Sequence, residues 1–93
     1  MSPYRRRARR DVNEPALVKV IRQCGGQWLP LNVTDGPDGV IGFHGRTELA
    51  EIKTEKGKLK AGQSEFIETW RGGPIYVLRT AADVVALLRD KMP

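Results

Sequence analysis

Residues 36–53 read GPDGVIGFHGRTELAEIK. Two short, largely apolar stretches, 40–43 and 47–53, flank the dipeptide His44-Gly45. Apolar stretches separated by a two-residue link of this kind are typical of a β-hairpin. The segment therefore predicts two antiparallel strands, from which the rest of the fold can be worked out.

The turn decides which residues face each other. If His44-Gly45 forms the whole turn, Phe43 pairs with Arg46, and counting back along both strands brings Asp38 opposite Glu51. Like charges that face each other destabilise an antiparallel pair, so two carboxylates held there share a proton or a cation. A hard ion such as Mg²⁺ takes oxygen ligands of this kind.

Lys53 follows Glu51 by two residues and so projects from the same face of the strand. A lysine in that position can orient or deprotonate an attacking water, or stabilise charge on a phosphate. The alternatives without a catalytic role are that Glu51 and Lys53 line the exposed face of an edge strand, and that Asp38 is only a turn former.

The flanking sequence alternates helical and extended patterns, and Pro30 marks the first strand as an edge or irregular strand. Thr80 and Asp83 form a capping-box pattern before the last helix. The expected order is α-β-β-β-α-β-α, an α/β fold with a mixed four-stranded sheet flanked by helices. The expected elements are a helix capped by Asn13 and ending near Cys24, strands at 28–33, 40–43, 47–53 and 75–78, and helices at 61–71 and from Thr80 onward.

Two polar residues stand at the head of apolar helical stripes. Glu14 shares a face with Leu17 and Ile21, and Gln63 shares one with Phe66 and Trp70. Both side chains are therefore expected to point inward. Taken alone, Glu14 is also explained by the helix dipole, and Gln63 by helix capping.

The 93 residues fit one domain, 13–93, preceded by a basic arm, 1–12. The net charge of +5 resides in residues 1–10, which carry five arginines and no acid, because the other 11 basic residues equal the 11 acids in number. Such an arm suits a nucleic-acid backbone. A tail that aids solubility or binds anionic membrane is the alternative, but no apolar anchor lies near it. The arm's basic residues are Arg5, Arg6, Arg7, Arg9 and Arg10.

The composition of the chain excludes several classes of protein. One cysteine, Cys24, permits no internal disulfide, and one cysteine with one histidine, His44, excludes a structural zinc site of the usual kind. No stretch reaches the length of a membrane span, and no apolar segment follows the charged N-terminus as in a secretory signal. A cytoplasmic protein without membrane contact is expected.

These residues together match a family pattern. Gly36-Pro37-Asp38-Gly39 followed by Glu51-Ile52-Lys53 resembles the PD-(D/E)XK nuclease motif. Glu14 on a first helix, the segment 57–63 ending in Gln63, and the strand segment 73–79 make the chain similar to the VRR-NUC (virus-type replication-repair nuclease) family. The resemblance covers about residues 14–88 and implies a restriction-endonuclease-like core.

The resemblance also implies roles. Asp38, Glu51 and the Ile52 carbonyl would bind Mg²⁺ or Mn²⁺, joined by Glu14 directly or through water. Lys53 would serve the attacking water, and Gln63 would support the site. Stand-alone members resemble homodimeric Holliday junction resolvases of phages and bacteria, which implies a bacterial or phage-infected host cell and no small-molecule cofactor. The arginine arm is not part of the family pattern.

The expected activity is metal-dependent cleavage of branched or structured DNA. Symmetric cutting of a four-way junction needs two sites, so a C₂ homodimer is expected, with Trp28, Trp70 or the last helix as candidate interface. The alternatives are a flap or other DNA repair nuclease, a catalytically silent DNA-binding module, and an RNA scaffold, which would need exposed stacking aromatics. Besides the arm, the residues expected to grip the DNA backbone are Lys56, Lys58, Lys60 and Arg71.

Overall fold

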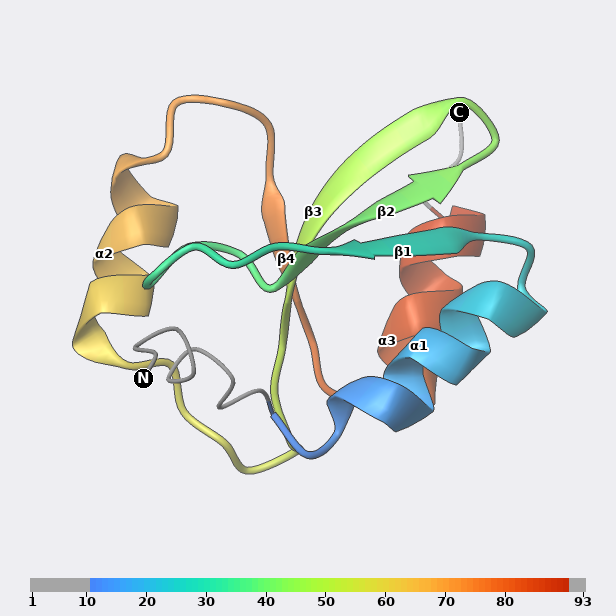
Figure 1. Ribbon diagram of the computed structural model, residues 1–93, viewed down its shortest axis with the longest axis horizontal. Coiled ribbons are helices and arrows are strands. Elements are labelled where there is room, and N and C mark those ends of the chain that lie inside the picture. The colour runs from blue at the N-terminus through green and yellow to red at the C-terminus, as the bar shows by residue number, and fades with distance from the viewer. Residues whose placement is uncertain (1–10, 91–93) are drawn as a thin grey trace, which may run out of the picture.

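The computed structural model describes residues 11–90, and its centre is a mixed four-stranded sheet (Figure 1). The strands lie side by side in chain order: β1 (Gln27–Pro30), β2 (Gly39–Phe43), β3 (Arg46–Ile52) and β4 (Ile75–Leu78). β1, β2 and β3 pair antiparallel, whereas β3 and β4 pair parallel. The predicted mixed sheet and the predicted order of elements are confirmed, as is the edge position of the proline-containing first strand.

The hairpin between β2 and β3 has the predicted register. Phe43 pairs with Arg46, and the paired register extends back to Gly39 and Ala50. His44 and Gly45 have φ angles of 48° and 79°. Positive φ at both central residues is the requirement of a type I′ turn, whose twist matches that of the flanking strands. The two-residue turn therefore sets the register that brings Asp38 to β3.

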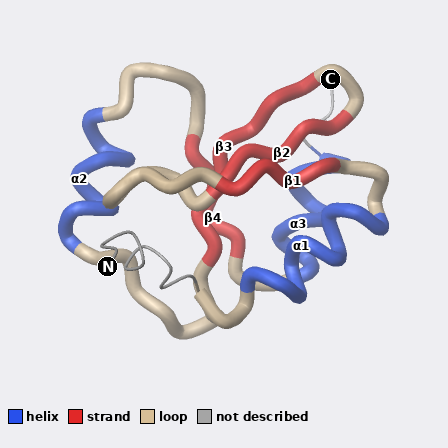
Figure 2. Tube along the Cα trace, viewed as in Figure 1, coloured by secondary structure: helices blue, strands red, loops and turns tan. Residues whose placement is uncertain are grey.

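Two helices cover one side of the sheet (Figures 1 and 2). α1 (Glu14–Gln23) packs beside α3 (Ala81–Val85), which continues as a π-helical turn, η2 (Ala86–Asp90). Their buried side chains meet those of the central strands in one core, since helical and strand periodicities each gather apolar residues on one face. The core comprises Leu17, Ile21, Ile41, Phe43, Ala50, Ile52, Leu78, Val84, Leu87 and Leu88.

The third helix, α2 (Ala61–Thr69), connects the parallel strands and lies apart from α1 and α3 (Figures 1 and 2). None of its residues is fully buried. Phe66 stacks on Trp70, with ring centroids 5.4 Å apart, and Trp70 remains 43% exposed. The predicted end at residue 71 was wrong by two residues, because Trp70 already has an extended backbone.

The two predicted helix caps differ in outcome. Thr80 accepts from the Asp83 N–H, and the Asp83 carboxylate accepts from the Thr80 N–H, so the capping box is confirmed. Asn13 occupies the N-cap position of α1, but its side chain makes no capping bond. Its amide donates instead to two distant backbone carbonyls, so the predicted cap was wrong.

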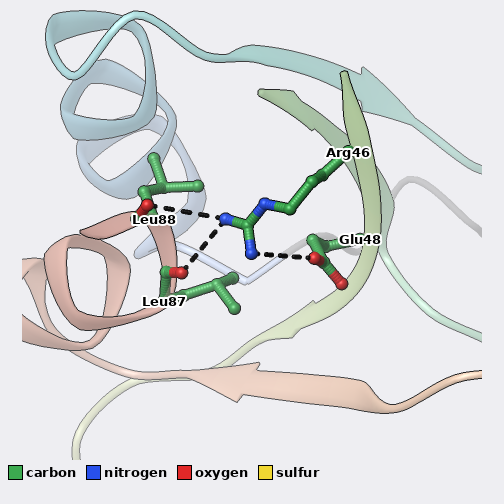
Figure 3. Close-up of polar contacts among 4 residues, drawn as sticks. All are labelled: Arg46, Glu48, Leu87 and Leu88. Atoms are coloured by element: carbon green, nitrogen blue, oxygen red, sulfur yellow. Dashed lines mark hydrogen bonds and ion pairs between the residues drawn. The ribbon is translucent and has the colours of Figure 1, made fainter. Parts of the chain in front are cut away.

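Arg46 ties the hairpin to the C-terminal helix (Figure 3). Its Nη2 lies 3.3 Å from the Leu87 carbonyl oxygen and 3.5 Å from that of Leu88, and its Nη1 lies 3.3 Å from Oε2 of Glu48. A guanidinium at this place satisfies carbonyls at a helix end, where intrahelical partners run out. None of the helices in residues 11–90 is both long and apolar enough to cross a membrane.

Candidate active site

Asp38 is held against β3 on both sides of Glu51. Its N–H donates to the Ala50 carbonyl (2.9 Å), and its Oδ2 accepts from the Ile52 N–H (2.7 Å). The carboxylate therefore bonds across to the neighbouring strand, beyond the end of the paired register. Asp38 and Glu51, predicted to be neighbours, are brought together.

Glu51 is the buried charged residue of the described chain, with 2% of its surface exposed. The flanking Ala50 and Ile52 enter the core on the side of α1 and α3. Since side chains alternate along a strand, Glu51 points to the opposite face, toward α2. Burial of a carboxylate is costly unless polar partners compensate it, so Glu51 needs hydrogen-bond donors around it.

Gln63 supplies such a partner and links α2 to the sheet. Its Nε2 donates to Oε2 of Glu51, while its Oε1 accepts from the Lys60 N–H (2.9 Å). The helix-capping interpretation of Gln63 is therefore confirmed, and the same side chain contacts Glu51, while its support of a catalytic site stays a prediction. This bond holds the Glu51 carboxylate from the side of the sheet on which α2 lies.

Lys53 leaves β3 two residues after Glu51. Its N–H donates to the Leu78 carbonyl (3.0 Å), which extends the parallel pairing of β3 and β4 by one step. The residue is half-buried. The predicted sequence of carboxylate and lysine thus stands at the end of β3, where the strand gives way to the loop 53–60.

Glu14 opens α1, as predicted, and its carboxylate faces β1. Its Oε2 accepts from the Trp28 indole N–H (3.1 Å), and the Trp28 ring occupies the space that a Cβ at Gly39 would take. Gly39 is the last residue of the GPDG segment, and glycine within a strand signals such a close approach. Trp28, predicted as a candidate interface residue, is half-buried and packs within the chain.

The groups in this region that could ligate a metal ion offer oxygen atoms. Asp38 and Glu51 contribute carboxylates, and the N–H of Ile52 points toward Asp38. The N–H and C=O of a strand residue point to the same side, so the Ile52 carbonyl also faces that side of β3. These are the ligand types that Mg²⁺ and Mn²⁺ take. Within residues 11–90, no group of three or more His, Cys, Asp and Glu side chains is arranged to hold a metal ion, and the place of Glu14 at an ion stays a prediction.

The predicted DNA-gripping residues in the described chain are exposed. Lys56, Lys58 and Lys60 belong to the loop before α2, and Arg71 follows that helix. The five arm arginines, with the rest of residues 1–10, lie outside the described part of the chain.

Sequence reasoning missed two contributors to this region, Trp28 and Asn13. Only the glycine at position 39 signalled that a large side chain, here the Trp28 ring, lies close to the strand. The carbonyls bound by Asn13 lie 40 and 66 residues along the chain, and no local pattern signals them.

Comparison with protein-family models, with curated proteins and with solved structures finds no match to this chain. The resemblance to VRR-NUC domains therefore remains a prediction from the motif residues.

Proposed function

We propose that this protein is a metal-dependent endonuclease with a restriction-endonuclease-like core that hydrolyses phosphodiester bonds in branched DNA. One observation carries the proposal: Asp38 is bonded to β3 on both sides of the buried Glu51, with Lys53 two residues farther on. This juxtaposition joins two acidic ligands and a cationic side chain at one strand end.

Asp38, Glu51 and the Ile52 carbonyl would hold Mg²⁺ or Mn²⁺, and Glu14 is the further candidate. When bound, the ion would act as a Lewis acid on the scissile phosphate and on water. Gln63 keeps the Glu51 carboxylate oriented through its amide. Lys53 positions the attacking water or stabilises charge that develops on the phosphate.

The charge distribution supports a nucleic-acid substrate. The excess of basic residues resides in the arm, and the exposed lysines of the loop before α2 follow the proposed site directly. Two cuts in a four-way junction require two such sites, which a C₂ homodimer would supply. We therefore place a homodimeric junction resolvase first among the possible endonucleases.

The test is cleavage of a labelled four-way junction, beside flap and duplex controls, in Mg²⁺, Mn²⁺ or EDTA. Asp38→Asn removes the charge but keeps the shape, and should lower the metal-dependent cleavage rate about 100-fold or more without loss of junction binding. Asp35→Asn is the matched control, because Asp35 lies exposed in the same turn-rich segment and its left-handed backbone (φ 61°) tolerates asparagine.

The products distinguish the alternatives. Paired symmetric nicks on the junction would identify a resolvase, whereas cutting confined to flaps would indicate a repair nuclease. If the folded protein binds DNA but cuts no substrate with either metal, the endonuclease proposal is wrong and a DNA-binding module remains.

A further inference from the structure

We propose that Asn13 is a positioning residue for this site: its side-chain amide clamps the ends of β3 and β4 and so fixes the backbone from which Lys53 projects. The inference rests on the proposed function, in which Lys53 serves the chemistry. Asn13 itself touches no reacting group, so it acts through Lys53.

The clamp consists of two hydrogen bonds from one nitrogen. Nδ2 of Asn13 donates to the carbonyl oxygens of Lys53 and Arg79, each at 2.9 Å. Both carbonyls lie just beyond the ends of the parallel strands, where the Lys53 N–H has made the last bond, to Leu78. A primary amide has two hydrogens on one nitrogen, and here each serves one strand end.

Lys53 is consequently held at both backbone polar groups. Its N–H binds β4 and its C=O binds Asn13, so the start of its side chain is fixed relative to Glu51, two residues earlier. Asn13 also directly precedes Glu14, the first residue of α1. One side chain thus joins the beginning of α1 to the strand end that carries Lys53.

The local chemistry explains why this asparagine does not cap its helix. Its φ and ψ of −80° and −10° are helical, whereas a capping residue normally has an extended backbone. The side chain is directed to the strand ends instead, where two partly buried carbonyls would otherwise lack these donors. Tertiary contact therefore prevails over the local capping preference.

The clamp borders a hollow at the carboxyl ends of the parallel strands. Arg79, which lines the hollow, donates from Nη1 to the carbonyls of Thr54 (2.9 Å) and Gly57 and so holds the loop after Lys53. Nδ2 of Asn13 and Nη1 of Arg79 are thus engaged in bonds to backbone carbonyls, so these two nitrogens support the strand ends and the loop rather than a ligand. The hollow is lined by Asn13, Thr54, Glu55, Lys56, Arg79 and Thr80.

The experiment compares Asn13→Ala and Asn13→Asp with wild type in single-turnover cleavage, over a range of protein concentrations and with the folded fraction measured by circular dichroism. The maximal rate per folded molecule should fall about tenfold or more in Asn13→Ala, because small misplacements of a catalytic group are costly. The maximal rate of Asn13→Asp should fall further, since this substitution places a carboxylate acceptor against two carbonyl oxygens. The protein concentration that gives half-maximal cleavage should not change. Asn32→Ala, at an exposed asparagine, is the matched control and should behave as wild type.

The split between rate and half-saturation separates positioning from a general structural role. If Asn13→Ala lowers only the melting temperature and retains the wild-type rate per folded molecule, the inference is overturned while the nuclease remains. A wild-type protein that cleaves nothing overturns the proposed function, and the inference with it. Should Asn13→Asp fail to fold, Asn13→Ala still decides the question.

Discussion

Glu51 shows at the residue scale how a buried charge depends on its donors. Gln63→Leu keeps a similar volume but removes the amide that donates to the carboxylate. We expect the free energy of unfolding to fall by about 1–3 kcal/mol, the usual effect of removing a hydrogen-bond partner from a buried polar group. Urea denaturation measures it, with Gln23→Leu on the exposed end of α1 as the control. Equal stability of Gln63→Leu and wild type would mean that the amide does not support Glu51.

Residue spacing alone was enough to predict the neighbourhood of Asp38 and Glu51. A two-residue turn fixes the pairing, and period-two alternation then fixes the face, so both follow from local rules. The same rules cannot reveal Asn13, because its acceptors become neighbours only after β3 and β4 have paired. The carboxylate that meets Trp28 is likewise set by packing of α1 against β1.

At the scale of elements, Arg46 is the link between hairpin and helix whose removal should lower the free energy of unfolding most. It joins the hairpin to the last helical turn through two carbonyls and pairs with Glu48, and both charged side chains are about five-sixths buried, at 16% and 15% exposure (Figure 3). Arg46→Met should lower the free energy of unfolding by about 2–3 kcal/mol, since bonds to charged groups exceed neutral ones in strength.

The measurement is urea denaturation together with amide hydrogen exchange. Arg22→Met, at an exposed arginine in the last turn of α1, should cost much less. The double variant Arg46→Met, Glu48→Leu should recover part of the loss, because it leaves no carboxylate without its ion-pair partner. Loss confined to a faster-exchanging hairpin, with η2 unchanged, would contradict the proposed link to the helix.

The elements themselves were largely predictable, and the exceptions share one cause. Hairpin, edge strand and the Thr80 capping box depend on turn chemistry and nearest neighbours, which the sequence states directly. The end of α2 at Thr69 and the π-helical turn at Ala86–Asp90 have no such local signal. Apolar spacing gave no indication that α2 would remain without a fully buried residue.

For the whole molecule, the two faces of the sheet differ in what they bury. The face covered by α1 and α3 holds the apolar core, while the other face holds Glu51 beneath Gln63 of α2. The domain can therefore be stable through one face and carry its charged site on the other. Residues 11–93 have equal numbers of basic and acidic residues, so long-range attraction of DNA should depend on the five arginines of the arm.

Deletion of residues 1–10 tests whether the attraction of DNA depends on the arm. Five of the 16 basic residues are lost, which leaves 11 against 11 acids and a formal net charge of zero. If all five arginines contact phosphates, the slope of log K against log salt should become shallower by about 4.5, at roughly 0.9 per contact. Fluorescence anisotropy with a labelled junction over a salt series measures the slope.

An arm with all five arginines replaced by lysine is the matched control, since it keeps the charge and should keep the slope. The truncated protein should still cleave at low salt, because Asp38, Glu51 and Lys53 belong to the domain and not to the arm. An unchanged slope after truncation would assign phosphate binding to the exposed lysines before α2 instead. Loss of cleavage even at low salt, with binding restored, would mean that the arm contributes to the chemistry itself.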